Sequence, residues 1–236
     1  EVFQPDYNKW WEHLDALKSK YPLRYDSSWR DEEGREIPTQ YVIQKLWELT
    51  RTYKPIVTTG VGQHQMWAAQ YFLVDEPRRF LTSAGLGSMG FGLPAAVGAQ
   101  VANPNALVID LDGDRSFFMT KAELDTIARF NLPVKIVVFD NSGHGMVKQW
   151  QDNQYEKRYI ASQYRNINFA EYAKLFKDLN PNIDSNRTSR LEEVEPALKK
   201  MINHPGPYLL HIDSRYEHCR PMVPGGMSVR EMELQN

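Results

Sequence analysis

Two apolar runs with polar ends constrain the fold of this chain more than any other feature. The first, at residues 106–111, stops at Asp112-Gly113-Asp114, and the second, at residues 134–139, stops at Asp140-Asn141-Ser142-Gly143. The segment between them has the apolar spacing of a helix. The side chains available to pack on that helix are Phe117, Leu124, Ile127, Ala128 and Phe130. Strand, helix and strand in this order predict a βαβ unit in a parallel sheet.

Oxygen-bearing side chains follow both predicted strands. Asp114 follows the first and Asn141 the second, and a right-handed crossover brings both to one rim of the sheet, where ligands bind in α/β folds. A carboxylate, an amide oxygen and nearby backbone carbonyls suit a hard cation such as Mg²⁺, completed by ligand phosphates. Amide groups at the following helix start favour the same anion. The alternative is that Asp114 and Asn141 only form turns and caps.

The composition excludes several classes of protein. A net charge of −2 gives no electrostatic reason to expect nucleic acid or an anionic membrane as partner. The single cysteine, Cys219, rules out an internal disulfide and fits a reducing compartment. The sequence predicts no signal peptide, and no apolar run approaches the roughly 20 residues of a membrane span. Because the chain begins with Glu1 and not with Met, we expect a piece of a longer protein or a processed product.

Helices and strands alternate along the rest of the sequence. This alternation predicts an α/β fold, a doubly wound parallel sheet with helices on both faces. The polar segment 26–37 is predicted to be an exposed linker. Asn168 with Glu171, and Ser189 with Glu192, have the spacing of capping boxes. The expected helices lie at 7–21, from 38 onward, at 63–71, around Pro94, at 145–154 and after Asn168 and Ser189; the further strands lie at 56–59 and 208–212.

Four glycines surround Met89 in the segment 82–102. Glycine density of this kind allows the backbone to approach a ligand closely, or it allows tight helix packing, and the sequence leaves both open. The glycines are Gly85, Gly87, Gly90 and Gly92.

Gly113-Asp114 and Asp140-Asn141 together resemble the thiamine-diphosphate signature, in which Gly-Asp-Gly is followed further on by Asn-Asn. Two positions depart from it. Arg115 stands where the family has a small residue, and Asp140 replaces the first Asn.

The resemblance extends over nearly the whole chain. The segments GVGQHQMWAAQ (60–70), TSAGLGSMGFGLPAAVGAQVA (82–102), PVKIVVFDN (133–141), GMVKQWQ (145–151) and PMVPGG (221–226) are similar to the carboxyl-terminal domain of acetohydroxyacid synthase, also called acetolactate synthase. This implies a thiamine-diphosphate and Mg²⁺-binding domain at 38–215, preceded at 1–37 by a helix and linker from another domain and followed by a tail at 216–236. The implied reaction condenses pyruvate with a second 2-ketoacid, with loss of CO₂, in valine, leucine and isoleucine biosynthesis.

The family architecture implies the partners. Its full-length subunit has a pyrimidine-binding domain, a middle domain that carries FAD, and the diphosphate-binding domain. The cofactor lies between the pyrimidine domain of one subunit and the diphosphate domain of another, so a homo-oligomer (a homodimer at least) is expected, and a regulatory subunit is possible. The activating glutamate belongs to the pyrimidine domain, so we expect this chain alone to be inactive. The expected location is the cytoplasm in a bacterium, and a chloroplast or mitochondrion in a eukaryote.

Residue roles follow from the resemblance. Met89 corresponds to the apolar residue that holds thiamine in its bent, reactive form, and is assigned as catalytic. Asp114, Asn141 and the carbonyl of Gly143 would bind Mg²⁺. The remaining cofactor-binding residues would be Gln63, His64, Gly87, Gly113, Arg115, Ser116, Gly145 and Met146, and the substrate channel would be lined by Met146, Val147 and Trp150.

Alternatives remain open at several of these positions. Met146 and Trp150 could be ordinary core residues, and His64 could be a structural histidine satisfied by the backbone. The Arg115 side chain could face the phosphates, point outward or block the site, and we favour the first two. Asp140 adds negative charge near an anion, which costs affinity unless Arg115 or the metal offsets it.

Arg115 and Asp140 therefore support a second hypothesis, a non-catalytic module that keeps the fold and an interface but has lost cofactor binding. A third hypothesis is another thiamine-diphosphate 2-ketoacid decarboxylase or oxidase. Trp150 and the QHQMW run at 63–67 count against the third.

Overall fold

The computed structural model describes residues 6–223 and 227–232, and the chain divides into two compact units. The smaller unit joins the residues before 26 to those after 219. It contains helix α1 (Asn8–Lys20), which confirms the helix expected at 7–21, and a short 3₁₀ helix, η3 (Val229–Glu231). The aromatic side chains of Trp10 and Trp11 on α1 are exposed. Of the family-like segment 221–226, residues 224–226 lie outside the described residues.

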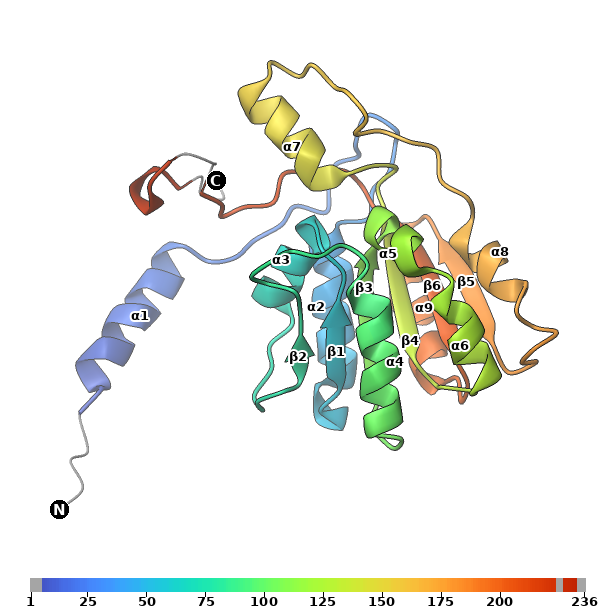
Figure 1. Cartoon of the computed structure of the whole chain (residues 1–236). Coiled ribbons are helices and arrows are strands. Elements are labelled where there is room, and N and C mark those ends of the chain that lie inside the picture. Colours follow the sequence, from blue (N-terminus) through green and yellow to red (C-terminus); the bar gives the residue numbers. More distant parts are fainter. Residues whose placement is uncertain (1–5, 224–226, 233–236) are drawn as a thin grey trace. The chain divides into compact units, whose positions relative to one another are not determined.

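A parallel sheet of six strands forms the centre of the larger unit, residues 26–219 (Figure 1). Its strand order is β2-β1-β3-β4-β6-β5, and every neighbouring pair is parallel. The predicted doubly wound α/β fold is confirmed. The strands are β1 (Ile56–Thr59), β2 (Phe80–Leu81), β3 (Val108–Gly113), β4 (Lys135–Asp140), β5 (Asp184–Thr188) and β6 (Tyr208–Asp213).

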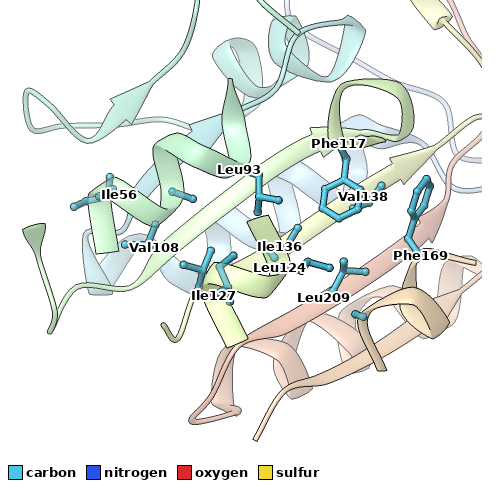
Figure 2. Close-up of a cluster of buried hydrophobic side chains, with 14 residues drawn as sticks. Ile56, Leu93, Val108, Phe117, Leu124, Ile127, Ile136, Val138, Phe169 and Leu209 are labelled. Carbon is cyan, nitrogen blue, oxygen red and sulfur yellow. The ribbon is translucent and has the colours of Figure 1, made fainter. Parts of the chain in front are cut away.

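Helices cover both faces of this sheet because alternate strand residues point to opposite sides and both sides are apolar. One face packs against α4 (Gly92–Ala102), α5 (Asp114–Thr120), α6 (Glu123–Arg129) and α8 (Phe169–Lys174). Figure 2 shows this core, in which Phe117 and Leu93 lie over strand residues such as Ile136 and Val138. The other face is covered by α2 (Thr39–Thr50), α3 (Gln63–Tyr71) and α9 (Val194–Asn203).

Two local expectations are wrong, and the two edge strands, β2 and β5, were not predicted. The helix between β3 and β4 is two short helices, and Phe130 does not pack but is 71% exposed, because α6 ends at Arg129 and Asn131 turns the chain with a positive φ. Ser189 and Glu192 form no capping box, since the 3₁₀ helix η2 (Leu191–Glu193) precedes α9 and Thr188 donates its hydroxyl hydrogen to Glu193. Strand β5 was not anticipated, because its sequence DSNRT carries no apolar run at this sheet edge. At α8, by contrast, Asn168 caps the helix by accepting from the backbone N–H groups of Ala170 and Glu171.

The segment 26–37 belongs to the larger unit, and although it is exposed over most of its length it contacts the rest of that unit at several points. Ile37, at its end, is fully buried and forms a β-bridge with Ser214. The buried guanidinium of Arg215 donates to the backbone carbonyls of Asp26 and Trp29. Arg35 donates to the hydroxyl of Ser142, in the loop after β4. The prediction of an exposed linker therefore holds only for its first part, because its last residues pack against the sheet.

Residues 6–223 and 227–232 contain no helix that is both long enough and apolar enough to cross a membrane.

Candidate functional site

A cavity of about 250 Å³ lies where β1, β3 and β4 end. The chain leaves β1 through α3 on one face of the sheet and leaves β3 through α5 on the other, so this is the switch point at which parallel α/β sheets bind ligands. The structure brings together here every residue predicted to bind the cofactor or metal. The lining includes Gln63, His64, Gly87, Met89, Gly113, Asp114, Arg115, Ser116, Asn141, Gly143, Gly145, Met146 and Val147.

Trp150 is the one predicted site residue that does not line this cavity. It lies on α7 (Gly145–Gln154), the helix that also carries Met146 and Val147 at its start, and its side chain is partly buried. Its placement in a substrate channel therefore has no support from the cavity itself.

Asp114 is a buried carboxylate at the start of α5, only 3% exposed. Its Oδ1 accepts from the backbone N–H of Arg115, and its Oδ2 accepts from the N–H of Gly143 at 3.1 Å and from the side-chain amide of Asn166. Burial, and then the nearby carboxylate of Asp140, raise the pKa of Asp114. The negative charge of Asp114 is therefore disfavoured in the structure and would be stabilised by a bound cation. Together with the Asn141 amide and the Gly143 carbonyl, this carboxylate fits the oxygen ligand set of a hard divalent cation.

Asp140, the departure from the family signature, is held by three donors. Its Oδ1 accepts from the N–H of Ser142 at 2.8 Å and from Asn166 Nδ2 at 2.7 Å, and its Oδ2 lies 3.0 Å from His211 Nε2. Burial alone would raise the pKa of Asp140, but the hydrogen bonds from His211 and Asn166 outweigh it and lower that pKa. Asp140 is therefore an ionised carboxylate.

Asn166 and His211 were not predicted as site residues. Asn166 Nδ2 contacts both Asp114 and Asp140 and so bridges the ends of β3 and β4. His211, in β6, is fully buried and accepts the backbone N–H of Phe169 at Nδ1, so its proton lies on Nε2 and is donated to Asp140. The sequence signal was slight: a histidine inside an apolar strand, opposite a strand that ends in an aspartate.

Asp140, His211 and Asp213 have suitable atoms close enough together for a metal ion. However, both ring nitrogens of His211 already have hydrogen-bond partners, and Asp213 pairs with Arg187 at 2.9 Å. The structure supports an aspartate–histidine pair here.

Three side chains that were expected to hold the diphosphate, those of Gln63, Ser116 and His64, form hydrogen bonds to other parts of this chain. Gln63 donates both hydrogens of its amide nitrogen, to Gln149 and to the carbonyl of Glu217. The Ser116 hydroxyl accepts from the N–H groups of Val61 and Gly90. These side chains join loops around the cavity, which leaves backbone N–H groups at the helix starts as the donors for an anion.

His64 is a structural histidine whose ring is hydrogen-bonded to the backbone, which was the alternative to a role in binding the diphosphate. Its Nε2 accepts the N–H of Gly113 at 3.1 Å, and burial lowers its pKa to about 3. It is therefore neutral and cannot supply positive charge to a phosphate.

Of the two roles that the glycine-rich segment left open, the structure shows tight packing. Gly87 and Gly90, on either side of Met89, have positive φ values of 61° and 85°, which favour glycine. At Gly92, a Cβ atom would lie 2.5 Å from the backbone nitrogen of Gly60, so this glycine permits the close approach of α4 to the end of β1.

The guanidinium of Arg115 lies 3.9 Å from the centre of the Tyr164 ring, in the cavity wall. His144 packs edge-on against the same ring. No carboxylate among the described residues lies within ion-pairing distance of Arg115, and its Nε is buried without a hydrogen-bond partner. The side chain is thus retained beside the cavity as an unpaired cation by a cation–π contact.

Comparison with known proteins agrees with this geometry. Residues 60–212 match the family described as "Thiamine pyrophosphate enzyme, C-terminal TPP binding domain". The chain is 46% identical to acetolactate synthase 1, chloroplastic, of Oryza sativa subsp. japonica, over 97% of this chain and 35% of the relative. It is 45% identical to acetolactate synthase 1, chloroplastic, of Zea mays (97% and 36%) and 42% identical to acetolactate synthase, chloroplastic, of Arabidopsis thaliana (96% and 33%).

The chain spans about a third of the length of these relatives. The match over residues 60–212 includes β1, β3 and β4 and the cavity at their ends, the place where the sequence resembled a thiamine-diphosphate site. The chain belongs to the thiamine pyrophosphate (thiamine diphosphate) enzymes, as their C-terminal TPP-binding domain.

Proposed function

We propose that this chain binds thiamine diphosphate with Mg²⁺ and forms the diphosphate-binding half of an acetolactate synthase active site. The observation that carries this proposal is the cavity of about 250 Å³ at the carboxyl ends of β1, β3 and β4, which is lined by all the predicted cofactor residues. The similarity to three chloroplastic acetolactate synthases supports the same function.

Asp114, Asn141 and the Gly143 carbonyl would hold the metal. The diphosphate would bind the backbone N–H groups that begin α3 and α7, where helix amides are unpaired and the dipole favours an anion. The partly buried Met89 would support the thiamine from the cavity wall. When bound, thiamine diphosphate supplies the electron sink for decarboxylation of a 2-ketoacid; the residues of this chain bind, orient and shield it.

The remaining parts of the proposal concern the complete enzyme. Its substrates would be pyruvate and a second 2-ketoacid, as in branched-chain amino-acid biosynthesis. A pyrimidine-binding domain of a second subunit would complete the site in a homo-oligomer, FAD would lie in a middle domain, and a regulatory subunit is an optional partner. The chloroplastic relatives favour the organelle over the cytoplasm as the location.

The non-catalytic module is the competing hypothesis, and two observations weigh against it. The added negative charge of Asp140 is balanced by hydrogen bonds from His211 and Asn166. The Arg115 side chain rests on Tyr164 beside the cavity, and a cavity of about 250 Å³ remains.

The proposal is tested by calorimetric titration of the chain with thiamine diphosphate in the presence and absence of Mg²⁺. We expect one cofactor per chain with Mg²⁺, and loss of Mg²⁺-dependent binding in Asp114→Ala. Asp125→Ala, which removes a carboxylate on the exposed side of α6, is the matched control and should bind as the unaltered chain does. Failure of the unaltered chain to bind the cofactor would favour the non-catalytic module.

A further inference from the structure

A second cavity, of about 450 Å³, adjoins the cofactor cavity. The two share Asn141, Gly143 and Gly145 and no other lining residue. Its other walls are residues 29–33, the outer side of α7, the loop after α7, and the residues Tyr216 and His218 that follow β6. This volume is typical of sites for small molecules.

Asp152 of α7 organises one wall. Its carboxylate accepts from the hydroxyls of Tyr159 and Tyr216 and lies 2.8 Å from Nε2 of His218. One turn earlier on α7, Lys148 places its Nζ 3.7 Å from the ring centre of Tyr216 and 4.7 Å from that of Tyr159. Because Asp152 fixes both rings by their hydroxyls, Lys148 is oriented before any ligand arrives.

Four carboxylates and three lysine or arginine side chains line this cavity, and three of the four carboxylates already have hydrogen-bond or ion-pair partners, those of Asp31, Glu33 and Asp152. Arg30 pairs with Glu36, and Glu33 pairs with Arg35. Asp31 accepts from backbone N–H groups, including that of Tyr216.

Within residues 6–223 and 227–232, by contrast, neither Lys148 nor Lys157 has a carboxylate within 4.0 Å. Glu32, at the exposed edge, is the one unpaired acid of the lining. Two cations of the lining, Lys148 and Lys157, therefore have no carboxylate of the described residues within ion-pairing distance.

Backbone strain is also concentrated here. Four of the seven non-glycine residues with positive φ in the described chain lie in or beside the wall: Ser142, Glu156, Lys157 and Ala161. Strain of this kind clusters at ligand clamps. Next to Ala161, the lining residue Ser162 is only 1% exposed, and its hydroxyl has no hydrogen-bond partner.

We propose that this cavity is a second ligand site, for a small organic anion bound by Lys148 and Lys157. The tyrosine rings and Trp29 form the apolar part of the wall. The site does not depend on the proposed function, since Lys148 and Lys157 line this cavity and do not line the cofactor cavity.

The experiment is calorimetric titration of the full chain with two anions that differ in their charged group. Succinate represents ligands with carboxylates, and glycerol 3-phosphate represents phosphate esters. Succinamide serves as the neutral counterpart of succinate. We expect saturable binding of one anion per chain, at least tenfold weaker with Lys148→Met and with Lys157→Met, and unchanged with Lys174→Met, an exposed lysine on α8. Tenfold corresponds to about 1.4 kcal/mol.

Three results would overturn the proposal. The first is the absence of saturable binding by both anions. The second is equal affinity for succinate and succinamide, a comparison that needs no variant. The third is displacement of the bound anion by thiamine diphosphate with Mg²⁺, which would place the anion in the cofactor cavity. Binding of the anion by a chain that fails to bind thiamine diphosphate would support the second site and contradict only the proposed function.

Discussion

His211 Nε2 lies 3.0 Å from Oδ2 of Asp140 and donates its proton to it, while the opposite ring nitrogen accepts the N–H of Phe169. This pair joins the carboxyl end of β4 to β6 and to the start of α8. It explains how the chain tolerates a carboxylate where the family signature has an asparagine: the added charge has a buried donor of its own.

We predict that His211→Leu destabilises the fold by about 2–4 kcal/mol, because it leaves the Asp140 carboxylate and the Phe169 N–H without their partner. Adding Asp140→Asn to this variant should recover at least about 1 kcal/mol, since the orphaned charge is then removed. Urea unfolding of both single variants and the double variant measures this coupling. His13→Leu, on the exposed surface of α1, is the control, and additive effects within about 0.5 kcal/mol would contradict the pairing.

A second prediction concerns the bridge made by Asn166. Without its amide, Asp114 and Asp140 lose a shared donor and repel each other, so the orientation of Asp114 relaxes. Asn166→Ala should therefore weaken Mg²⁺-dependent binding of thiamine diphosphate about tenfold, within the range for residues that orient metal ligands. Calorimetry is the measurement, with the exposed Asn105→Ala as control. Equal affinity in Asn166→Ala and the unaltered chain would remove Asn166 from the site.

Arg115→Gly restores the small residue of the family signature. If the unpaired guanidinium contacts the diphosphate, its removal should weaken cofactor binding by roughly 1–2 kcal/mol at low salt, and by less at high salt because screening already weakens the contact. Titration at two salt concentrations measures both effects. A gain in affinity of tenfold, about 1.4 kcal/mol, would mean that Arg115 obstructs the cavity.

The stability of the fold should fall with acid because of His64. Burial lowers its pKa from 6.5 to about 3, so below pH 6.5 the unfolded chain binds a proton that the folded chain does not. The free energy of unfolding should decrease by about 1.4 kcal/mol per pH unit from this residue between pH 6.5 and 3. His64→Asn should abolish this part of the slope in urea titrations between pH 6.5 and 4.5. Parallel curves for the two proteins would show that His64 does not titrate as stated.

The chain supplied with thiamine diphosphate, Mg²⁺ and pyruvate should form no acetolactate. The glutamate that activates the aminopyrimidine is expected on another domain, so the proton relay is missing even where the cofactor binds. A colorimetric assay for acetoin, formed from acetolactate in acid, measures the product. Turnover by the 236-residue chain would show that the site is complete without that domain.

Local pattern alone was enough for the fold class and for the position of the cavity, whereas most of the individual cavity residues were predicted from the resemblance to the family. Apolar runs at 106–111 and 134–139, each ending in Asp or Asn and glycine, determine buried parallel strands with polar carboxyl ends, because those side chains admit few other arrangements. Since the carboxyl ends of neighbouring parallel strands meet at one edge, Asp114, Asn141 and Gly143 had to converge there.

The tertiary structure alone decided which hydrogen-bond partner each polar side chain at the cavity has. Gln63, His64 and Ser116 reach the cavity as expected, but their hydrogen bonds go to Gln149, Gly113 and Val61, which are distant in sequence. His211 belongs to the site because strand order places β6 beside β4, and Asn166 because the segment before α8 brings its amide to both Asp114 and Asp140. A hydrogen bond is directional and short, so its partner depends on the packing of several elements at once, whereas burial of an apolar face depends on a pattern that one segment carries by itself.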